Sequence, residues 1–172
     1  LIKMMMDVTY RANEEVTLKE ELELLDCYIY IQKMRFMNFE VEYCIPEELL
    51  SYRVNKLVLQ PFVENSILHA FKDKEEVGII CIKASLKTEY LELIVEDNGK
   101  GFEWEAEKVK KEESGRKDHV GIQNVCERIR LNYGGEYGVI IESIAEKGTT
   151  VKIHLPIYCE SSVTGDESAM DL

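Results

Sequence analysis

The 172-residue sequence has no apolar run near the ~18 residues of a membrane-spanning helix, and no signal peptide is visible. It is also short of positive charge, since 21 lysines and arginines face 33 aspartates and glutamates, a formal net charge of −12. This balance argues against nucleic acid as the main partner, because phosphate backbones bind basic surfaces. A small anionic nucleotide stays possible, since backbone N–H groups can bind it locally.

Cysteine pairs are also lacking. The five cysteines are scattered, with no C-x-x-C motif: Cys27, Cys44, Cys81, Cys126 and Cys159. This spacing is typical of reduced thiols in a cytosol and disfavours disulfides or a zinc site. The composition, 45% hydrophobic and 31% charged, is that of a globular chain. Because the chain begins with Leu1 and not Met, we expect it to be a piece of a longer protein.

A long helix is predicted near the start of the chain. Thr17 and Glu20 form a capping box, in which each side chain satisfies a backbone N–H group of the first turn. Apolar residues then recur at helical spacing to about residue 37: Leu18, Leu22, Leu25, Ile29 and Phe36. This stripe is typical of a helix packed on its own core, and pairing with another chain is the alternative.

Alternating apolar residues predict strands in three places. One strand covers residues 39–45 and is ended by Pro46, residues 78–98 predict a hairpin, and residues 137–156 predict a second hairpin across Lys147-Gly148. Hairpins with helices between them indicate the α+β class. We therefore expect a two-layer α/β sandwich whose mostly antiparallel sheet is covered by helices on one face.

Two more helices are predicted between these strands. Residues 55–71 form one of them, with Pro61 inside it as a kink, and residues 119–133 form the other, which Gly134 ends. The last stretch, residues 158–172, is small and acidic, and it predicts a disordered tail.

The segment "QPFVENSILHA" (residues 60–70) places polar residues in a buried helix. Polar groups at this depth must be paired or must face a ligand. Asn65 and His69 are four residues apart and so lie on the same helix face. A histidine satisfied within the core is the alternative for His69.

The segment "EDNGKG" (residues 96–101) follows a predicted strand and has two interpretations. Asn98-Gly99 is a common tight-turn signal, but the next predicted element is too distant for a short hairpin. Glycines also let a backbone approach a ligand, and the carboxylate of Asp97 can accept a hydrogen bond from an amino group. The long charged loop at 98–118 is typical of a lid over a ligand, or of a solvated charge run.

Four motifs in order resemble the N, G1, G2 and closing boxes of the GHKL ATPase superfamily: "QPFVENSILHA", "VEDNGKGF", "HVGIQNVCERI" and "EKGTTVKIHLP". The sequence is most similar to sensor histidine kinases of the LytS/YesM type, over roughly residues 14–157. This resemblance implies a Bergerat-type fold and a three-part chain. A linker helix from the dimerisation region would occupy residues 1–37, an ATP-binding catalytic domain residues 38–157, and the tail residues 158–172.

The resemblance also implies ATP and Mg²⁺ as cofactors and assigns residues to them. Asp97 would accept the adenine amino hydrogen, supported by Thr149 on the neighbouring strand. Glycines would shape the pocket and its lid: Gly99, Gly101 and Gly121. Asn65 would bind Mg²⁺, for which a neutral carbonyl ligand is suitable when phosphates supply the charge. His69 would face the phosphates, and Glu64, beside Asn65, is a catalytic candidate.

Three positions depart from the superfamily pattern. Pro61 stands where the ATPases keep the glutamate that activates water, which disfavours ATP hydrolysis and suits transfer to a protein acceptor. Leu68 replaces a lysine that kinases often place before the histidine, and His119 replaces the first glycine of the G2 box. These two changes favour a weakened phosphate site.

The resemblance implies a protein-histidine kinase whose acceptor histidine lies upstream of this chain, since His69, His119 and His154 belong to the nucleotide-binding domain. Its expected partners are ATP, the histidine-bearing dimerisation domain of the same protein and a response regulator. The full-length protein is expected to be a homodimeric, membrane-anchored sensor kinase with this domain in the cytoplasm. A stand-alone GHKL ATPase and a nucleotide-binding pseudokinase are the alternatives.

Overall fold

The computed structural model describes residues 14–36, 38–71, 76–101 and 120–158, and the fold is stated for these ranges. Most of the predicted loop at 98–118 and of the tail lies outside them. The first tail residue, Tyr158, is described, and its carbonyl accepts a hydrogen bond from the Arg53 N–H at 2.7 Å. Among the described residues, no helix combines the length and apolar character that crossing a membrane requires.

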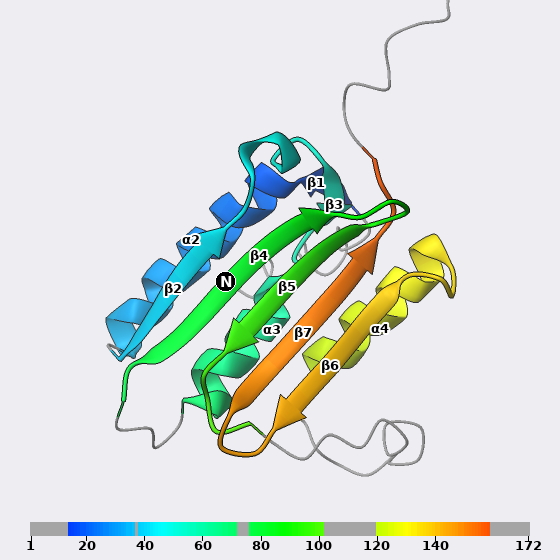
Figure 1. Cartoon of the computed structure of the whole chain (residues 1–172). Helices are drawn as coiled ribbons and strands as arrows, with labels where there is room; N and C mark the ends of the chain where they lie inside the picture. Colours follow the sequence, from blue (N-terminus) through cyan, green and yellow to red (C-terminus); the bar gives the residue numbers. More distant parts are fainter. Residues whose placement is uncertain (1–13, 37, 72–75, 102–119, 159–172) are drawn as a thin grey trace, which may run out of the picture.

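A five-stranded sheet forms one layer of the fold (Figure 1). Its strands, in spatial order, are β2 (Phe39–Cys44), β4 (Gly78–Leu86), β5 (Leu91–Asp97), β7 (Gly148–Leu155) and β6 (Gly138–Ile144). β2 pairs with β4 in parallel, and the other three pairings are antiparallel. The predicted mostly antiparallel sheet is confirmed, and so are the β4–β5 and β6–β7 hairpins.

The helices α2 (Leu18–Arg35), α3 (Gln60–Asn65) and α4 (Val120–Tyr133) all cover one face of this sheet (Figure 1). Alternate residues of the central strands point at the helices and are fully or almost fully buried: Ile80, Ile82, Leu91, Leu93, Val95 and Ile153. Val125 and Ile129 of α4 pack into the same core, whereas Leu131 of that helix is exposed. The predicted two-layer α+β sandwich is therefore confirmed.

α2 begins and packs as its sequence predicts. The Thr17 hydroxyl accepts from the Glu20 N–H at 3.2 Å, and the Glu20 carboxylate accepts from the Thr17 N–H at 2.8 Å, which completes the capping box. Leu18, Leu25 and Ile29 are buried in the core of the sandwich. The helix ends at Arg35, and the division of the chain at residue 37 stays a prediction.

A short two-stranded sheet and the buried Glu21 position the segment that leads into α3. β1 (Glu15–Thr17) pairs antiparallel with β3 (Arg53–Asn55). Beyond β3, the buried Glu21 carboxylate accepts from the backbone N–H groups of Leu57 at 2.7 Å and Leu59 at 3.0 Å. Burial raises the pKa of Glu21, and these hydrogen bonds oppose that shift. Glu21 therefore ties α2 to the segment that leads into α3.

The predicted helix over 55–71 with a kink at Pro61 is wrong at its start. Asn55 belongs to β3, and Leu57 has a left-handed backbone (φ 59°), so the helix begins only at Gln60. Pro61 therefore stands in the first turn, where its missing N–H costs no helical hydrogen bond, and it causes no kink. The helix continues from Ser66 to Ala70 with π-helical bonding (η2), including a Phe71 N–H to Ser66 carbonyl bond of 3.2 Å.

Candidate nucleotide-binding site

Asp97 ends β5, and its carboxylate accepts hydrogen bonds from Ser66 and Gly99. Oδ2 accepts from the hydroxyl of Ser66 on η2 at 2.8 Å, and Oδ1 accepts from the Gly99 N–H at 2.9 Å. Asp97 is only partly buried. Each carboxylate oxygen has two lone pairs and can accept more than one hydrogen bond.

Thr149 is the direct antiparallel partner of Asp97, since the register of β5 and β7 places these two residues opposite each other. Thr149 is buried, and its hydroxyl lies 3.0 Å from the Ser143 hydroxyl of β6. The structure therefore brings together two residues that are 52 positions apart, counted from Asp97 to Thr149 in the sequence.

Two glycines let the loop after β5 pass close to its neighbours. A Cβ on Gly99 would lie 2.4 Å from the Ala70 Cβ, and Gly101 has a positive φ of 57° with the Ile144 carbonyl at 2.0 Å from a Cβ position. Between them, Lys100 donates its N–H to the Ala70 carbonyl at 3.0 Å and accepts from Glu146 at 2.7 Å. The loop is thus clamped to the end of η2 and to the β6–β7 turn.

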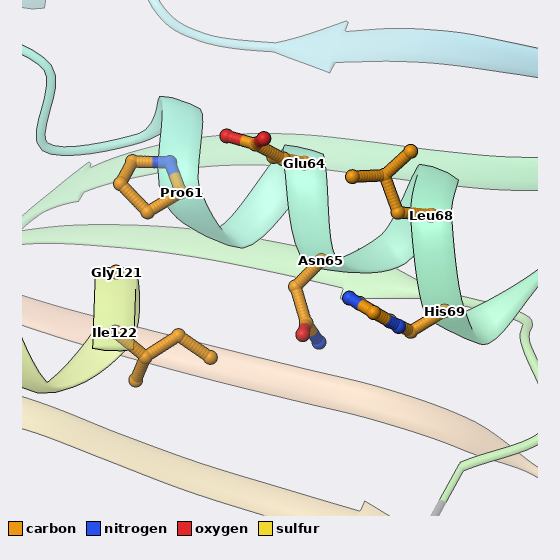
Figure 2. Close-up of a pocket in the computed structure, with 7 residues that line it drawn as sticks. All are labelled: Pro61, Glu64, Asn65, Leu68, His69, Gly121 and Ile122. Carbon is orange, nitrogen blue, oxygen red and sulfur yellow. The ribbon is translucent and has the colours of Figure 1, made fainter. Parts of the chain in front are cut away.

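A pocket lies between α3–η2 and the start of α4. Its lining residues are Pro61, Glu64, Asn65, Leu68, His69, Gly121 and Ile122. Figure 2 shows the Asn65 and His69 side chains on one side of the helix, toward Gly121 and Ile122, whereas Glu64 projects from another side. The pocket therefore brings together four of the predicted site residues: Asn65, His69, Glu64 and Gly121.

Four other predicted site residues do not line this pocket: Asp97, Gly99, Gly101 and Thr149. They stand beside it, and the connection is Ser66, which follows Asn65 in the helix and hydrogen bonds to Asp97. Ser66 is buried and was missed by the sequence analysis. The available signal was the Ser66 hydroxyl itself, which directly follows Asn65 in a helix that was expected to be buried.

Glu64 lies close enough to α2 to influence Tyr28. Burial, and then the Glu64 carboxylate, raise the pKa of the Tyr28 hydroxyl. Within the described ranges, no group of three or more His, Cys, Asp or Glu side chains is placed to hold a metal ion.

Comparison with known families agrees with this geometry. Residues 53–158 match the profile of the histidine kinase-, DNA gyrase B- and HSP90-like ATPases. Residues 1–39 match a second profile, described as histidine kinase.

Individual relatives are sensor kinases. The chain is 31% identical over 147 residues to the sensor histidine kinase BtsS of Escherichia coli strain K12, and 34% identical over 151 residues to the sensor histidine kinase YesM of Bacillus subtilis. The aligned parts cover 85% and 86% of this chain, but only 25% of each relative. The chain thus spans about a quarter of the length of these relatives.

Solved structures share the fold at low sequence identity. The catalytic domain of the histidine kinase ThkA superposes with a TM-score of 0.60 at 20% identity, covering 85% of this chain and 97% of that one. A histidine kinase domain from Erythrobacter litoralis gives a TM-score of 0.59 at 17% identity, covering 83% of this chain and 62% of that one. Because the profile match over residues 53–158 covers more than half of the chain, the chain belongs to the family of histidine kinase-, DNA gyrase B- and HSP90-like ATPases.

Proposed function

We propose that this chain is the ATP-binding catalytic domain of a sensor histidine kinase, which transfers the γ-phosphoryl group of ATP to a histidine upstream of the chain. The observation that carries the proposal is the Asp97 carboxylate. It is held by Ser66 and Gly99, opposite Thr149, and adjacent to the pocket that contains Asn65 and His69.

Asp97 is the group suited to adenine. Hydrogen bonds from Ser66 and from the Gly99 N–H fix the orientation of its carboxylate, whose oxygens are hydrogen-bond acceptors, as the exocyclic amino group of adenine requires. A fixed acceptor prefers adenine over guanine, which presents a carbonyl at that position. Thr149, buried on the neighbouring strand, supports the same end of the site.

The pocket beside Asp97 is suited to the phosphates. Gly121 opens the first turn of α4, a helix of 14 residues, where unpaired N–H groups and the helix dipole favour an anion. The Asn65 carbonyl would contribute one neutral ligand to a Mg²⁺ that the phosphates also bind. His69 lies on the same side of the helix and would contact a phosphate oxygen (Figure 2).

Two further lining residues bear on the reaction. Pro61 supplies no carboxylate to activate water, so the bound γ-phosphoryl group is kept for a protein acceptor. Glu64 is the carboxylate among the lining residues, and we assign it to orient the incoming acceptor. Catalysis would then rest on positioning and charge neutralisation.

The partners follow from what this chain does not carry. Its histidines are His69, His119 and His154, all within or beside the ATP-binding domain. We therefore place the acceptor histidine, the dimerisation helices of a homodimer and the membrane anchor in other parts of the protein, as the greater length of the relatives supports. The phosphoryl group would pass from that histidine to a response regulator.

The metal assignment predicts a selective loss in Asn65→Ala. With Mg²⁺ present, we expect ATP affinity to fall about tenfold, roughly 1.4 kcal/mol, while adenosine binding changes little, because only the phosphates share the metal. Calorimetric titration of ATP and adenosine, with and without Mg²⁺, measures both effects. Leu68→Ala, which alters an apolar residue of the same pocket, should leave the Mg²⁺ dependence intact. An equal loss for adenosine would remove Asn65 from the metal site.

A further inference from the structure

The backbone of Leu57 is held by side chains from two different helices. Its N–H donates to the Glu21 carboxylate of α2 at 2.7 Å, and its carbonyl accepts from the Arg128 guanidinium of α4 at 3.3 Å. Leu57 has a φ of 59°, a left-handed conformation that residues other than glycine seldom adopt. Such a conformation persists only where the surroundings fix it, and here both backbone groups of the residue are fixed. The two helices therefore meet at one residue just before α3.

Glu21 and Arg128 are also charge partners. Glu21 is 1% exposed, and Arg128 is half-buried. Burial raises the pKa of Glu21, a shift that backbone hydrogen bonds and the Arg128 charge oppose, and burial lowers the pKa of Arg128, which the Glu21 charge opposes. The guanidinium thus serves two groups, the Leu57 carbonyl through a hydrogen bond and the Glu21 carboxylate through its charge.

The face of α4 that carries Arg128 also forms one wall of the pocket. Gly121 lies seven residues before Arg128, which is two helical turns and about 10 Å along the same face. At that end α4 approaches α3 closely, since a Cβ on Gly121 would lie 3.6 Å from the Pro61 Cβ, and both residues line the pocket. α4 is therefore held at two points, by Gly121 beside Pro61 and by the hydrogen bond from Arg128 to Leu57.

We propose that Arg128 is a positioning residue of the nucleotide site. By binding the Leu57 carbonyl, it fixes α4 against the segment that leads into α3, so that the first turn of α4 faces the phosphates beside Asn65. This role rests on the proposed function, because it requires the phosphates to lie in the pocket between α3–η2 and α4. A residue two turns away from the phosphates would then set their affinity.

The role predicts an effect on the phosphates and not on adenine. Asp97 and Thr149, the proposed adenine contacts, lie on β5 and β7, and their hydrogen-bond partners lie on η2, on the loop after β5 and on β6. A small displacement of α4 would leave these contacts in place while it moves the N–H groups of the first turn away from the phosphates. A merely structural role would instead weaken ATP and adenosine binding alike.

Titration of Arg128→Met with ATP and with adenosine tests this role. Methionine keeps a long apolar side chain but has neither the donor nor the charge. We therefore expect ATP affinity in the presence of Mg²⁺ to fall about tenfold, and adenosine affinity to change by less than about twofold. Arg128→Lys keeps the charge and a donor for the carbonyl, so it should recover part of the ATP affinity.

Two further variants complete the design. Arg130→Met is the matched control, since it removes the same charge from an exposed position of the same helix. Removing Arg128 alone leaves Glu21 buried without its counter-charge, which destabilises the domain. If circular dichroism shows that Arg128→Met is unfolded, the combination of Glu21→Gln with Arg128→Met removes both charges together. This double variant should show the same loss for ATP and not for adenosine.

The outcomes separate the positioning role from the proposed function. A parent chain that binds no ATP would overturn the proposed function and this role with it. A folded Arg128 variant that binds ATP as tightly as the parent, or that loses ATP and adenosine affinity equally, would overturn only the positioning role. A tenfold loss in Arg130→Met as well would trace the effect to net charge and would also contradict the role.

Discussion

Asp97→Asn is expected to weaken ATP binding about ten- to a hundredfold, a loss of roughly 1.5–3 kcal/mol. The carboxylate is held by hydrogen bonds from Ser66 and from the Gly99 N–H, and its oxygens are the proposed acceptors for adenine. An amide presents an NH₂ group on one side, so it either faces the Gly99 N–H with a donor or turns a donor toward adenine. Fluorescence or calorimetric titration with ATP measures the loss.

Two controls separate adenine recognition from general damage. Ser66→Ala removes one of the bonds that orient Asp97 but keeps the charge, so its loss in ATP affinity should be smaller than that of Asp97→Asn. GTP should bind poorly to the parent chain, and Asp97→Asn should not lower the GTP affinity to a comparable extent. Equal ATP affinity in parent and Asp97→Asn, with the fold intact, would remove Asp97 from the site.

Gly148→Ala is expected to cost about 2–6 kcal/mol of unfolding free energy, a large fraction of the roughly 5–15 kcal/mol that stabilises a domain of ordinary stability. Gly148 has a φ of 107°, and a Cβ there would lie 1.9 Å from the Asp97 carbonyl oxygen. The backbone strain contributes about 1–3 kcal/mol and the overpacking a similar amount. Because the colliding atom belongs to the backbone, no side-chain rotation relieves it.

Urea unfolding followed by circular dichroism measures this loss. Gly135→Ala is the comparison, since a Cβ at Gly135 meets nothing within 4 Å. We expect its midpoint to stay near that of the parent chain. A midpoint for Gly148→Ala as high as that of Gly135→Ala would mean that the β6–β7 turn does not approach Asp97 as described.

The elements specified by neighbouring residues were predictable from the sequence. Thr17 and Glu20 are three residues apart, and their capping box forms as the pattern indicates. Both hairpins form for the same reason, because alternation and turn residues are local signals. The candidate site residues could be located because their motifs resemble a known family, whereas their roles stay proposals.

Features that depend on distant residues were not predictable. The start of α3 is set by Leu57 and by the Glu21 carboxylate, which lies 36 and 38 residues before the two N–H groups that it binds. The prediction from neighbouring residues therefore placed the start of the helix too early, at residue 55. The hydrogen bond from Ser66 to Asp97 likewise joins residues 31 positions apart, and no periodicity reveals it.

Helix α2 is an intermediate case. Leu18, Leu25 and Ile29 predicted a helix packed on its own core, and the alternative was a helix that pairs with another chain. The structure places these three residues in the core and leaves Leu24, Ile31 and Met34 exposed. The interpretation as a helix packed on its own core is therefore confirmed for these three residues, and pairing with another chain stays a prediction.

The most direct test of the central claim is phosphoryl transfer in trans. This chain is mixed with labelled ATP, Mg²⁺ and a fragment of the parent protein that carries the upstream histidine. The proposal predicts acid-labile, base-stable label on the fragment, at a rate proportional to concentration, and none on this chain. Label on this chain alone, or firm ATP binding with no label on the fragment at any concentration, would contradict the kinase assignment.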